Sequence, residues 1–352
     1  MIYQNNFHII RFILACLIII SHSYSLVDPY FDINYTGHAA FKTLTSLKVY
    51  GFFVISGYLI YFSLEKTKSI TQFLSARLIR ILPLYILIIL ITTILCGFYF
   101  NGTYIQYLTQ SNTWSYLFNN ISIVGLKHTI NGVFSTNPLP DINGSIWSVP
   151  YLIMCYCIFS PIILLFNNID RKRLNHILIL VYIIGITVFS IINLAPIENL
   201  NPRINTALKF ALTFQTGLLI GRFSLIKKIS KPLLGLTIML FIISKFIGDH
   251  YDAIWKYISV LPFSILIIYI GLIPNKLFSK FGKYGDPSLT IYMLGFPIQQ
   301  MIISMYPNWH PLLLAAVTLS ILIPLGYLSW HYFEKRIVSW NKKRQQNSIE
   351  LK

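Results

Sequence analysis

Long apolar runs alternate with short polar segments along almost the whole chain. Each run has roughly 17 to 25 residues, the length that an α-helix needs to cross about 30 Å of hydrocarbon. The pattern predicts an all-α, polytopic integral membrane protein with about ten transmembrane helices, at residues 8–26, 43–64, 79–99, 146–166, 174–194, 205–222, 232–248, 253–273, 285–306 and 311–333. We expect one transmembrane domain over residues 1–340, followed by a basic cytoplasmic tail over residues 341–352.

The composition agrees with a chain that is solvated by lipid. Of the 352 residues, 55% are hydrophobic and 11% are charged, and the mean hydropathy is +0.64. A soluble domain has about 25% charged residues. The net charge of +17 would suggest nucleic-acid binding in a soluble protein. In a membrane protein the distribution of basic residues sets the topology instead, so we expect membrane lipids as partners and no nucleic acid.

Basic residues gather in every second connection between the predicted spans. Twenty of the 28 Lys and Arg residues lie near 66–80, 171–173, 222–231 and 276–283 or in the tail at 335–352, whereas the opposite connections hold six. The positive-inside rule then places both termini in the cytoplasm. The longest connection, 100–145, falls on the outer face, and its aromatic residues predict a short interfacial helix near 114–125.

Two ionisable residues lie inside the first predicted span. Arg11 and His22 are eleven residues apart, close to three helical turns, so they share one face and stand about 16 Å apart along the axis. An ionisable group within the bilayer costs about 2.5 kcal/mol or more, and such groups usually mark a functional path. A guanidinium near the cytoplasmic surface suits phosphate, and a deeper imidazole suits general-base chemistry on a hydroxyl. The alternative without a functional role is that the Arg11 side chain extends to the lipid headgroups and that His22 hydrogen-bonds a neighbouring carbonyl.

A second arginine pair marks the cytoplasmic start of the third span. Arg77 and Arg80 are three residues apart and face the same way. Phosphate binding and a topology signal are both open for this pair. In the preceding span, Ser56 and Gly57 permit close helix packing, which on its own explains them.

The order of these motifs resembles the acyltransferase-3 family of bacterial membrane-bound sugar O-acyltransferases. The resemblance is carried by Arg11 with His22, by Phe-Phe-Val-Ile-Ser56-Gly57-Tyr-Leu-Ile, by Arg77-x-x-Arg80 with Pro83 and Tyr85, by Asn137 to Tyr151 with Asn143 and Trp147, by Gly285-Asp-Pro-Ser288, and by Trp330-His331-x-x-Glu334. It covers nearly the whole chain in order.

The resemblance implies His22 as the catalytic residue. It also implies that Arg11, Arg77 and Arg80 hold acyl-CoA at the cytoplasmic mouth. Other residues of the matching motifs are expected to support the pore: Ser56, Gly57, Tyr85, Asn143, Trp147 and Tyr151. The implied reaction moves an acyl group, with acetyl favoured, from acyl-CoA to a hydroxyl of a surface polysaccharide or its lipid-linked precursor. Macrolide-like small molecules and peptidoglycan precursors stay open as acceptors, and the transfer is either direct or by way of His22. The expected location is the bacterial inner membrane, with acetyl-CoA as a co-substrate and no tightly bound cofactor.

The chain departs from the family pattern at three positions. Tyr50 and Leu152 stand where relatives commonly have Asp and Glu, and Gly295 stands where they often have His. The sequence leaves open whether Asp28, Asp32 or Asp141 substitutes as the acidic partner of His22. These departures keep a catalytically impaired relative as an alternative.

Another alternative is a transporter or flippase for a lipid-linked glycan, with the same charges along its path. The two halves of the chain lack repeat symmetry, which speaks against it. No metal site is expected from the histidine and cysteine spacings, and no phosphate loop or Gly-x-Ser-x-Gly motif is present.

Overall fold

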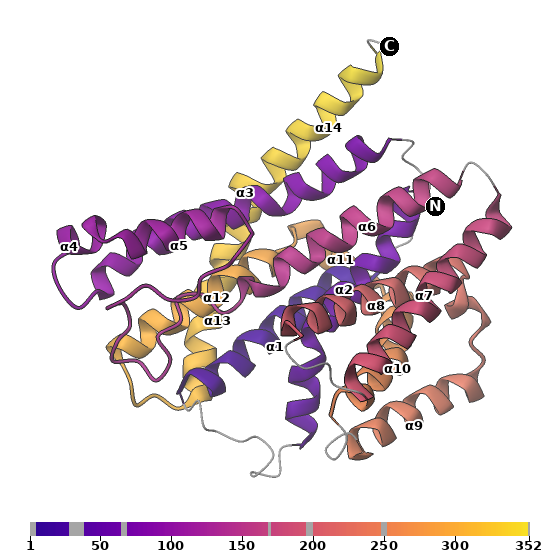
Figure 1. Ribbon diagram of the computed structural model, residues 1–352, viewed down its shortest axis with the longest axis horizontal. Coiled ribbons are helices and arrows are strands. Elements are labelled where there is room, and N and C mark those ends of the chain that lie inside the picture. The colour runs from indigo at the N-terminus through magenta and orange to yellow at the C-terminus, as the bar shows by residue number, and fades with distance from the viewer. Residues whose placement is uncertain are drawn as a thin grey trace. The chain divides into compact units, whose positions relative to one another are not determined.

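The regular elements are helices throughout the part of the chain that the computed structural model describes, residues 5–27, 39–64, 69–167, 170–194, 200–247 and 252–350. Figure 1 shows α1 (Phe7–Val27), α2 (Ala39–Leu64), α3 (Ile70–Cys96), α4 (Tyr104–Thr109), α5 (Ser111–Ile121), α6 (Val149–Asn167), α7 (Arg171–Leu194), α8 (Pro202–Arg222), α9 (Lys231–Ile247), α10 (Asp252–Leu272), α11 (Lys276–Lys280), α12 (Ser288–Met305), α13 (Pro311–Ser329) and α14 (Lys335–Glu350). Short 3₁₀ helices are η1 (Gly97–Tyr99), η2 (Ile146–Ser148), η3 (Leu225–Lys228) and η4 (Phe281–Tyr284), and η5 (Trp330–Glu334) is a π-helix.

A helix lies at each of the ten predicted spans, and the all-α prediction is confirmed. Within the described ranges, six helices are long and apolar enough to cross a membrane: Phe7–Val27, Leu47–Leu64, Ile70–Tyr99, Ile146–Leu165, Lys172–Leu194 and Pro311–Gln345. A seventh span results if Ser259–Leu272 and Lys276–Tyr284, which are bent by 79°, are counted together. The protein is therefore a multi-pass membrane protein, while the count of ten spans and the direction of the termini stay predictions.

The chain divides into two compact units. The first comprises Met1–Ile10, His38–Ser75 and Tyr151–Ser279, and the second comprises Arg11–Gly37, Ala76–Pro150 and Lys280–Lys352. In the first unit, α2 and α8 approach until their backbones touch. A Cβ atom on Gly57 would lie 1.9 Å from the Phe214 carbonyl oxygen, and one on Gly217 would lie 2.1 Å from the Val54 oxygen. Small residues thus bring these helices together, as is common between helices in lipid.

In the second unit, α12 contacts several other elements. Its residue Gly295 meets Ile19 of α1, and Pro287, just before α12, packs against Gly326 of α13. Phe296 belongs to a buried apolar cluster with residues of α1 and α13. A helix with so many neighbours is well placed to hold their side chains in register.

Contacts along α12 show that α1 and α3 run in the same direction as it does. The early residues Arg11 and Arg80 both reach Asp286, which directly precedes α12. Later in each helix, Ile19 accepts a hydrogen bond from Gln299, and Met301 packs against the cluster that contains Cys96. These three helices are the first, third and ninth predicted spans. Successive spans alternate in direction, so odd-numbered spans should run the same way, as these three do.

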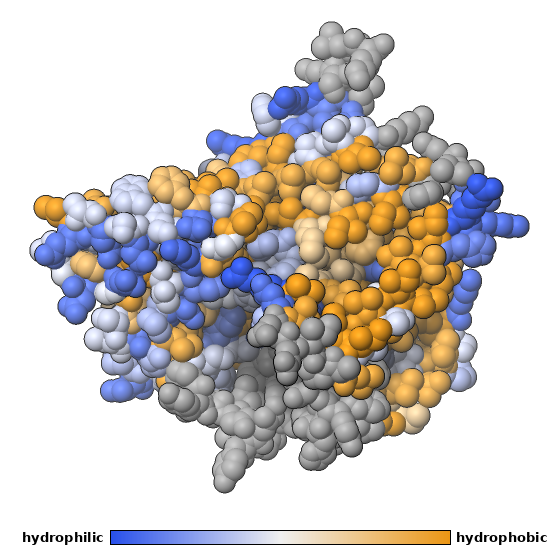
Figure 2. All heavy atoms as spheres, in the orientation of Figure 1, coloured by the Kyte–Doolittle hydropathy of each residue, from blue (hydrophilic) through white to orange (hydrophobic). Residues whose placement is uncertain are grey.

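The long connection after α3 is an ordered structure in the second unit. It forms α4 and α5, and its buried core includes Tyr107 and Tyr116. A helix was predicted near 114–125, and α5 confirms it with a start at Ser111 and an end at Ile121. Burial raises the pKa of both tyrosines. Figure 2 shows many hydrophilic side chains over α4 and α5.

Candidate active site

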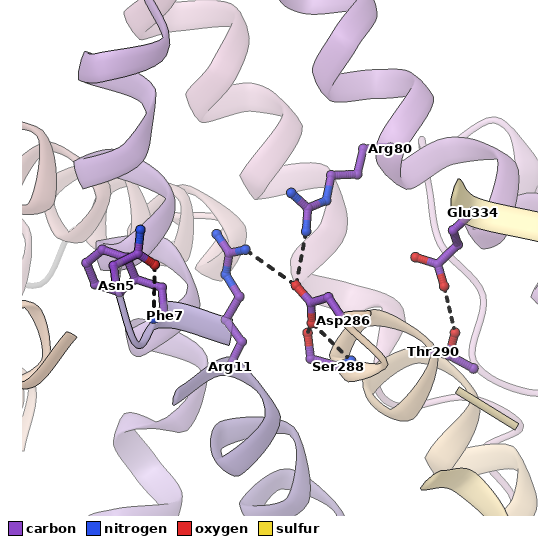
Figure 3. A network of polar contacts seen from close by, with 8 residues as sticks. All are labelled: Asn5, Phe7, Arg11, Arg80, Asp286, Ser288, Thr290 and Glu334. Carbon is purple, nitrogen blue, oxygen red and sulfur yellow. Dashed lines mark hydrogen bonds and ion pairs between the residues drawn. The ribbon is translucent and has the colours of Figure 1, made fainter. Parts of the chain in front are cut away.

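The arginines expected to bind phosphate converge on one buried carboxylate. Asp286 Oδ2 lies 3.1 Å from Arg80 Nη2 and 3.6 Å from Arg11 Nη1, and the Asp286 side chain is 3% exposed. Figure 3 shows both guanidinium groups directed toward this oxygen. Arg11 comes from α1 and Arg80 from α3, so residues 69 positions apart form one cationic cluster in the second unit.

The Asp286 carboxylate is itself fixed at the start of α12. Its Oδ1 atom accepts hydrogen bonds from the Ser288 backbone N–H, at 3.3 Å, and from the Ser288 hydroxyl. Backbone N–H groups at the start of a helix have no partner within that helix, and a carboxylate there also interacts favourably with the helix dipole. One oxygen therefore caps the helix and the other faces the arginines.

A second buried carboxylate ties α12 to the end of α13. Glu334 Oε1 accepts from the Thr290 hydroxyl at 3.1 Å (Figure 3). It also accepts from the Ser329 hydroxyl at 3.1 Å, and Glu334 is 5% exposed. It lies in the π-helix η5, an irregularity that is frequent at functional sites. The predicted Arg77 lies on α3 one turn before Arg80 and is half-buried.

His22 lies further along α1 and contacts the later part of α12. Its ring packs edge-on against Phe296, with 5.3 Å between ring centroids. Because Arg11 reaches Asp286 and His22 reaches Phe296, both side chains of α1 face the α12 segment. The two contacts of α1, which are eleven residues apart, thus match two positions of the α12 segment that are ten residues apart, Asp286 and Phe296.

Gln299 fixes the turn of α1 that carries His22. Its Nε2 atom donates to the Ile19 carbonyl oxygen at 2.8 Å and to the Ser23 hydroxyl at 2.6 Å. The carbonyl can only accept, so the amide orientation follows from its chemistry. Gln299 is fully buried, and its Oε1 atom has no hydrogen-bond partner within the described ranges. Gln299 therefore ties the turn of α1 that carries His22 to α12.

The Asn143 segment also reaches α12. Asn143 Nδ2 donates to the Met293 carbonyl oxygen at 2.9 Å, and a Cβ atom on Gly144 would lie 2.5 Å from Phe296 Cε2. The Ser148 and Tyr292 hydroxyls lie 2.7 Å apart. The long connection after α3 is thereby held near the Phe296 ring, which His22 also contacts.

The remaining predicted residues lie in several places. Tyr85 is buried and donates its hydroxyl to the Asn120 carbonyl oxygen at 2.9 Å, which joins α3 to α5. Trp147 is half-buried in η2 of the second unit. Ser56, Gly57 and Tyr151 belong to the first unit, where Gly57 packs on α8 and the Tyr151 ring lies 5.7 Å from that of Phe210.

Tyr50 and Leu152, which depart from the family pattern, both belong to the first unit. Tyr50 lies 5.6 Å from the Phe210 ring, centroid to centroid, and Leu152 is half-buried in α6. The Asp141 backbone oxygen accepts from Gln300 Nε2. Asp28 and Asp32, the other suggested acidic partners of His22, lie outside the described residues.

Sequence reasoning missed three residues of this site: Asp286, Phe296 and Gln299. Asp286 lies in the Gly285-Asp-Pro-Ser288 motif, but nothing in the sequence assigned it to the arginines. Gln299 had a usable signal, because an amide in the middle of an apolar run is unusual in a membrane helix. Phe296 had none, since aromatic residues are common throughout the chain.

Comparison with known proteins identifies the family. A family described as an acyltransferase domain matches residues 4–331, nearly the whole chain. The chain belongs to the acyltransferase-3 family. It is also 24% identical, over an alignment of 357 residues, to a protein of Shigella phage Sf6 named O-acetyl transferase, and the alignment covers 96% of each chain. No solved structure matches it significantly.

Family membership confirms the resemblance drawn from the motifs and makes the chain an acyltransferase. The matched region contains Arg11, His22, Arg80, Asp286 and Gln299, and thus the geometry around α12. The roles of these individual residues stay predictions.

Proposed function

We propose that this acyltransferase moves an acetyl group from cytoplasmic acetyl-CoA to a hydroxyl of a surface polysaccharide or of its lipid-linked precursor, such as O-antigen, capsule or exopolysaccharide. The observation that carries the proposal is the full-length family match to a chain in which Arg11 and His22 both face α12. The name of the phage relative supports acetyl transfer to oxygen. The expected site of action is the bacterial inner membrane.

The cationic cluster suits the donor. Coenzyme A carries phosphates, and the forked donors of Arg11 and Arg80 match phosphate oxygens. With the phosphates at this cluster, the thin pantetheine arm extends along α1 toward His22, about 16 Å away by helical rise. The thioester and an acceptor hydroxyl are then held together, which turns a bimolecular step into a positioned one.

His22 is the proposed general base. Its neutral imidazole takes the proton of the acceptor hydroxyl while that oxygen attacks the thioester carbonyl. A new C–O ester bond forms, the C–S bond breaks, and the proton passes to the departing sulfur of coenzyme A. This step needs no oxidant, metal or further co-reactant.

The test compares purified wild-type protein with His22→Ala, using acetyl-CoA labelled in the acetyl group and glycans from cells that carry the gene. We expect label on wild-type glycan and none with His22→Ala, although the variant stays folded in the membrane. His176→Ala is the matched control, because that histidine is exposed on α7. An active, well-expressed His22→Ala protein would remove His22 from the mechanism.

The same assay separates the rival functions. A flippase leaves no label on glycan but changes the amount of lipid-linked glycan on the outer face. A catalytically impaired relative leaves glycan acetylation unchanged when the gene is deleted. Mass spectrometry of surface glycans from cells with and without the protein identifies the acceptor sugar.

A further inference from the structure

Asp286 uses its two carboxylate oxygens for different tasks. Oδ1 accepts from the backbone and hydroxyl of Ser288, and Oδ2 faces Arg11 and Arg80. A carboxylate that is only a helix cap needs one oxygen. The second oxygen joins guanidinium groups from two other helices, α1 and α3, to the start of α12.

The Arg11 and Asp286 side chains are largely buried, so the pairing of their charges matters for both groups. Asp286 is 3% exposed and the Arg11 side chain is 12% exposed, so neither is well solvated by water. A buried charge without a counter-charge is strongly unfavourable. Without the carboxylate, we expect the Arg11 guanidinium to turn toward water or headgroups, because a long cationic side chain can snorkel.

We propose that Asp286 is a positioning residue, which holds Arg11 and Arg80 at the separation in which they bind the phosphates of acyl-CoA. This inference rests on the proposed function, because it assumes that the two arginines receive the donor. Asp286 itself does not touch the reacting atoms. It acts through the arginines.

Asp286 could alternatively occupy the phosphate site and be displaced when ligand phosphate binds. The anchoring of its Oδ1 atom favours the positioning role over this placeholder role. Two hydrogen bonds from Ser288 hold the carboxylate in place, so Oδ2 stays directed at the arginines when ligand arrives. Each guanidinium has five N–H donors in a planar fork, and one carboxylate oxygen engages one nitrogen of each. Within this trio two guanidinium groups face one carboxylate, so the arginines keep N–H donors and positive charge with which to attract phosphate.

The experiment measures binding of coenzyme A to purified full-length protein in detergent, together with KM for acetyl-CoA and kcat. Asp286→Asn keeps an oxygen for Ser288 but presents N–H groups to the arginines, whereas Asp286→Ala removes both tasks. Ser288→Ala removes one donor to Oδ1 and leaves Oδ2 unchanged. Asp170→Asn is the matched control, because exposed Asp170 caps α7 by the same bond to the N–H two residues ahead.

We expect Asp286→Asn and Asp286→Ala to weaken coenzyme A binding by about tenfold or more, the size of one lost charge-assisted hydrogen bond. KM should rise by more than kcat falls. Ser288→Ala keeps the backbone N–H bond to Oδ1, so it should weaken coenzyme A binding by less than Asp286→Ala does. Asp170→Asn should bind coenzyme A within about twofold of wild type.

Other results overturn the proposal in distinguishable ways. If Asp286→Asn bound coenzyme A as tightly as wild type or more tightly, Asp286 would be a placeholder or a helix cap and would not position the arginines. Equal effects of Ser288→Ala and Asp286→Ala, with normal binding by Asp286→Asn, would show that only the helix cap matters. If Asp286→Asn does not fold, Asp286→Glu keeps the charge on a longer arm, and normal binding by it would contradict the need for a fixed separation. A wild-type protein that binds no coenzyme A would instead refute the proposed donor, and this inference with it.

Discussion

Substitution of Gln299 by Met tests whether α12 positions the turn of α1 that carries His22, the proposed general base. Gln299 Nε2 donates to Ile19 and Ser23, the residues on either side of His22 in that turn. Met has a similar length and volume but cannot donate a hydrogen bond. The change therefore removes the tie between the helices with little change in packing.

Two opposing energies decide the effect on stability. Hydrogen bonds between membrane helices are worth about 0.6 kcal/mol on average and up to about 1.7 kcal/mol, so two bonds contribute about 1 to 3 kcal/mol. The buried Gln299 Oε1 atom has no partner in the described part of the chain, and such an orphaned acceptor costs about 1 to 3 kcal/mol. Met removes both terms, so we expect the free energy of unfolding to change by about 1 kcal/mol or less.

The effect on activity should be much larger. A misplacement of about 1 Å can slow an enzyme by about 100-fold, and the His22 turn loses its described bonds to the Gln299 side chain. We expect kcat for acetyl transfer to fall by about 10- to 100-fold. The assay combines initial rates with labelled acetyl-CoA and thermal unfolding of the purified protein.

Gln215→Met is the matched control. Gln215 is 2% exposed, and its Nε2 atom donates to the Leu178 carbonyl oxygen at 2.9 Å, which joins α8 to α7 in the first unit. This variant should lose about 1 kcal/mol of stability and keep its rate per folded molecule. A Gln299→Met protein with the wild-type rate, or one whose rate falls no further than that of the control, would refute the reasoning.

Two further predictions concern packing and pH. Gly295→Ala should lower stability by about 1 to 3 kcal/mol in thermal unfolding, because its Cβ atom would lie 2.0 Å from Cδ1 of the buried Ile19. Gly235→Ala on α9, where nothing lies within 4 Å of the new Cβ atom, should instead be neutral or stabilising. Burial raises the pKa of Tyr107 above its unfolded value of about 10, so its contribution to stability is complete below that pH and is lost as the pH rises toward the folded-state pKa. Melting temperatures between about pH 8 and 11 test this, and Tyr107→Phe should flatten the alkaline decline.

The sequence by itself determined the helical class, the family and part of the site. Hydrophobic runs of membrane length located the helices at the ten predicted spans, since lipid requires backbone hydrogen bonds to be satisfied within the segment. The polar helix α14 follows no such run. The spacing of Arg11 and His22 predicted a shared face, because helical periodicity is local. Both side chains do face the α12 segment.

Only the tertiary structure decided which distant residues meet. Asp286 lies 275 positions after Arg11, and Gln299 lies 280 positions after Ile19, so no periodicity relates them. The sequence left Asp28, Asp32 or Asp141 open as the acidic partner of His22, whereas the carboxylate that meets the arginines is Asp286, in the segment before α12. Such contacts arise when helices that are each fixed by lipid pack together, and that packing depends on small residues such as Gly295.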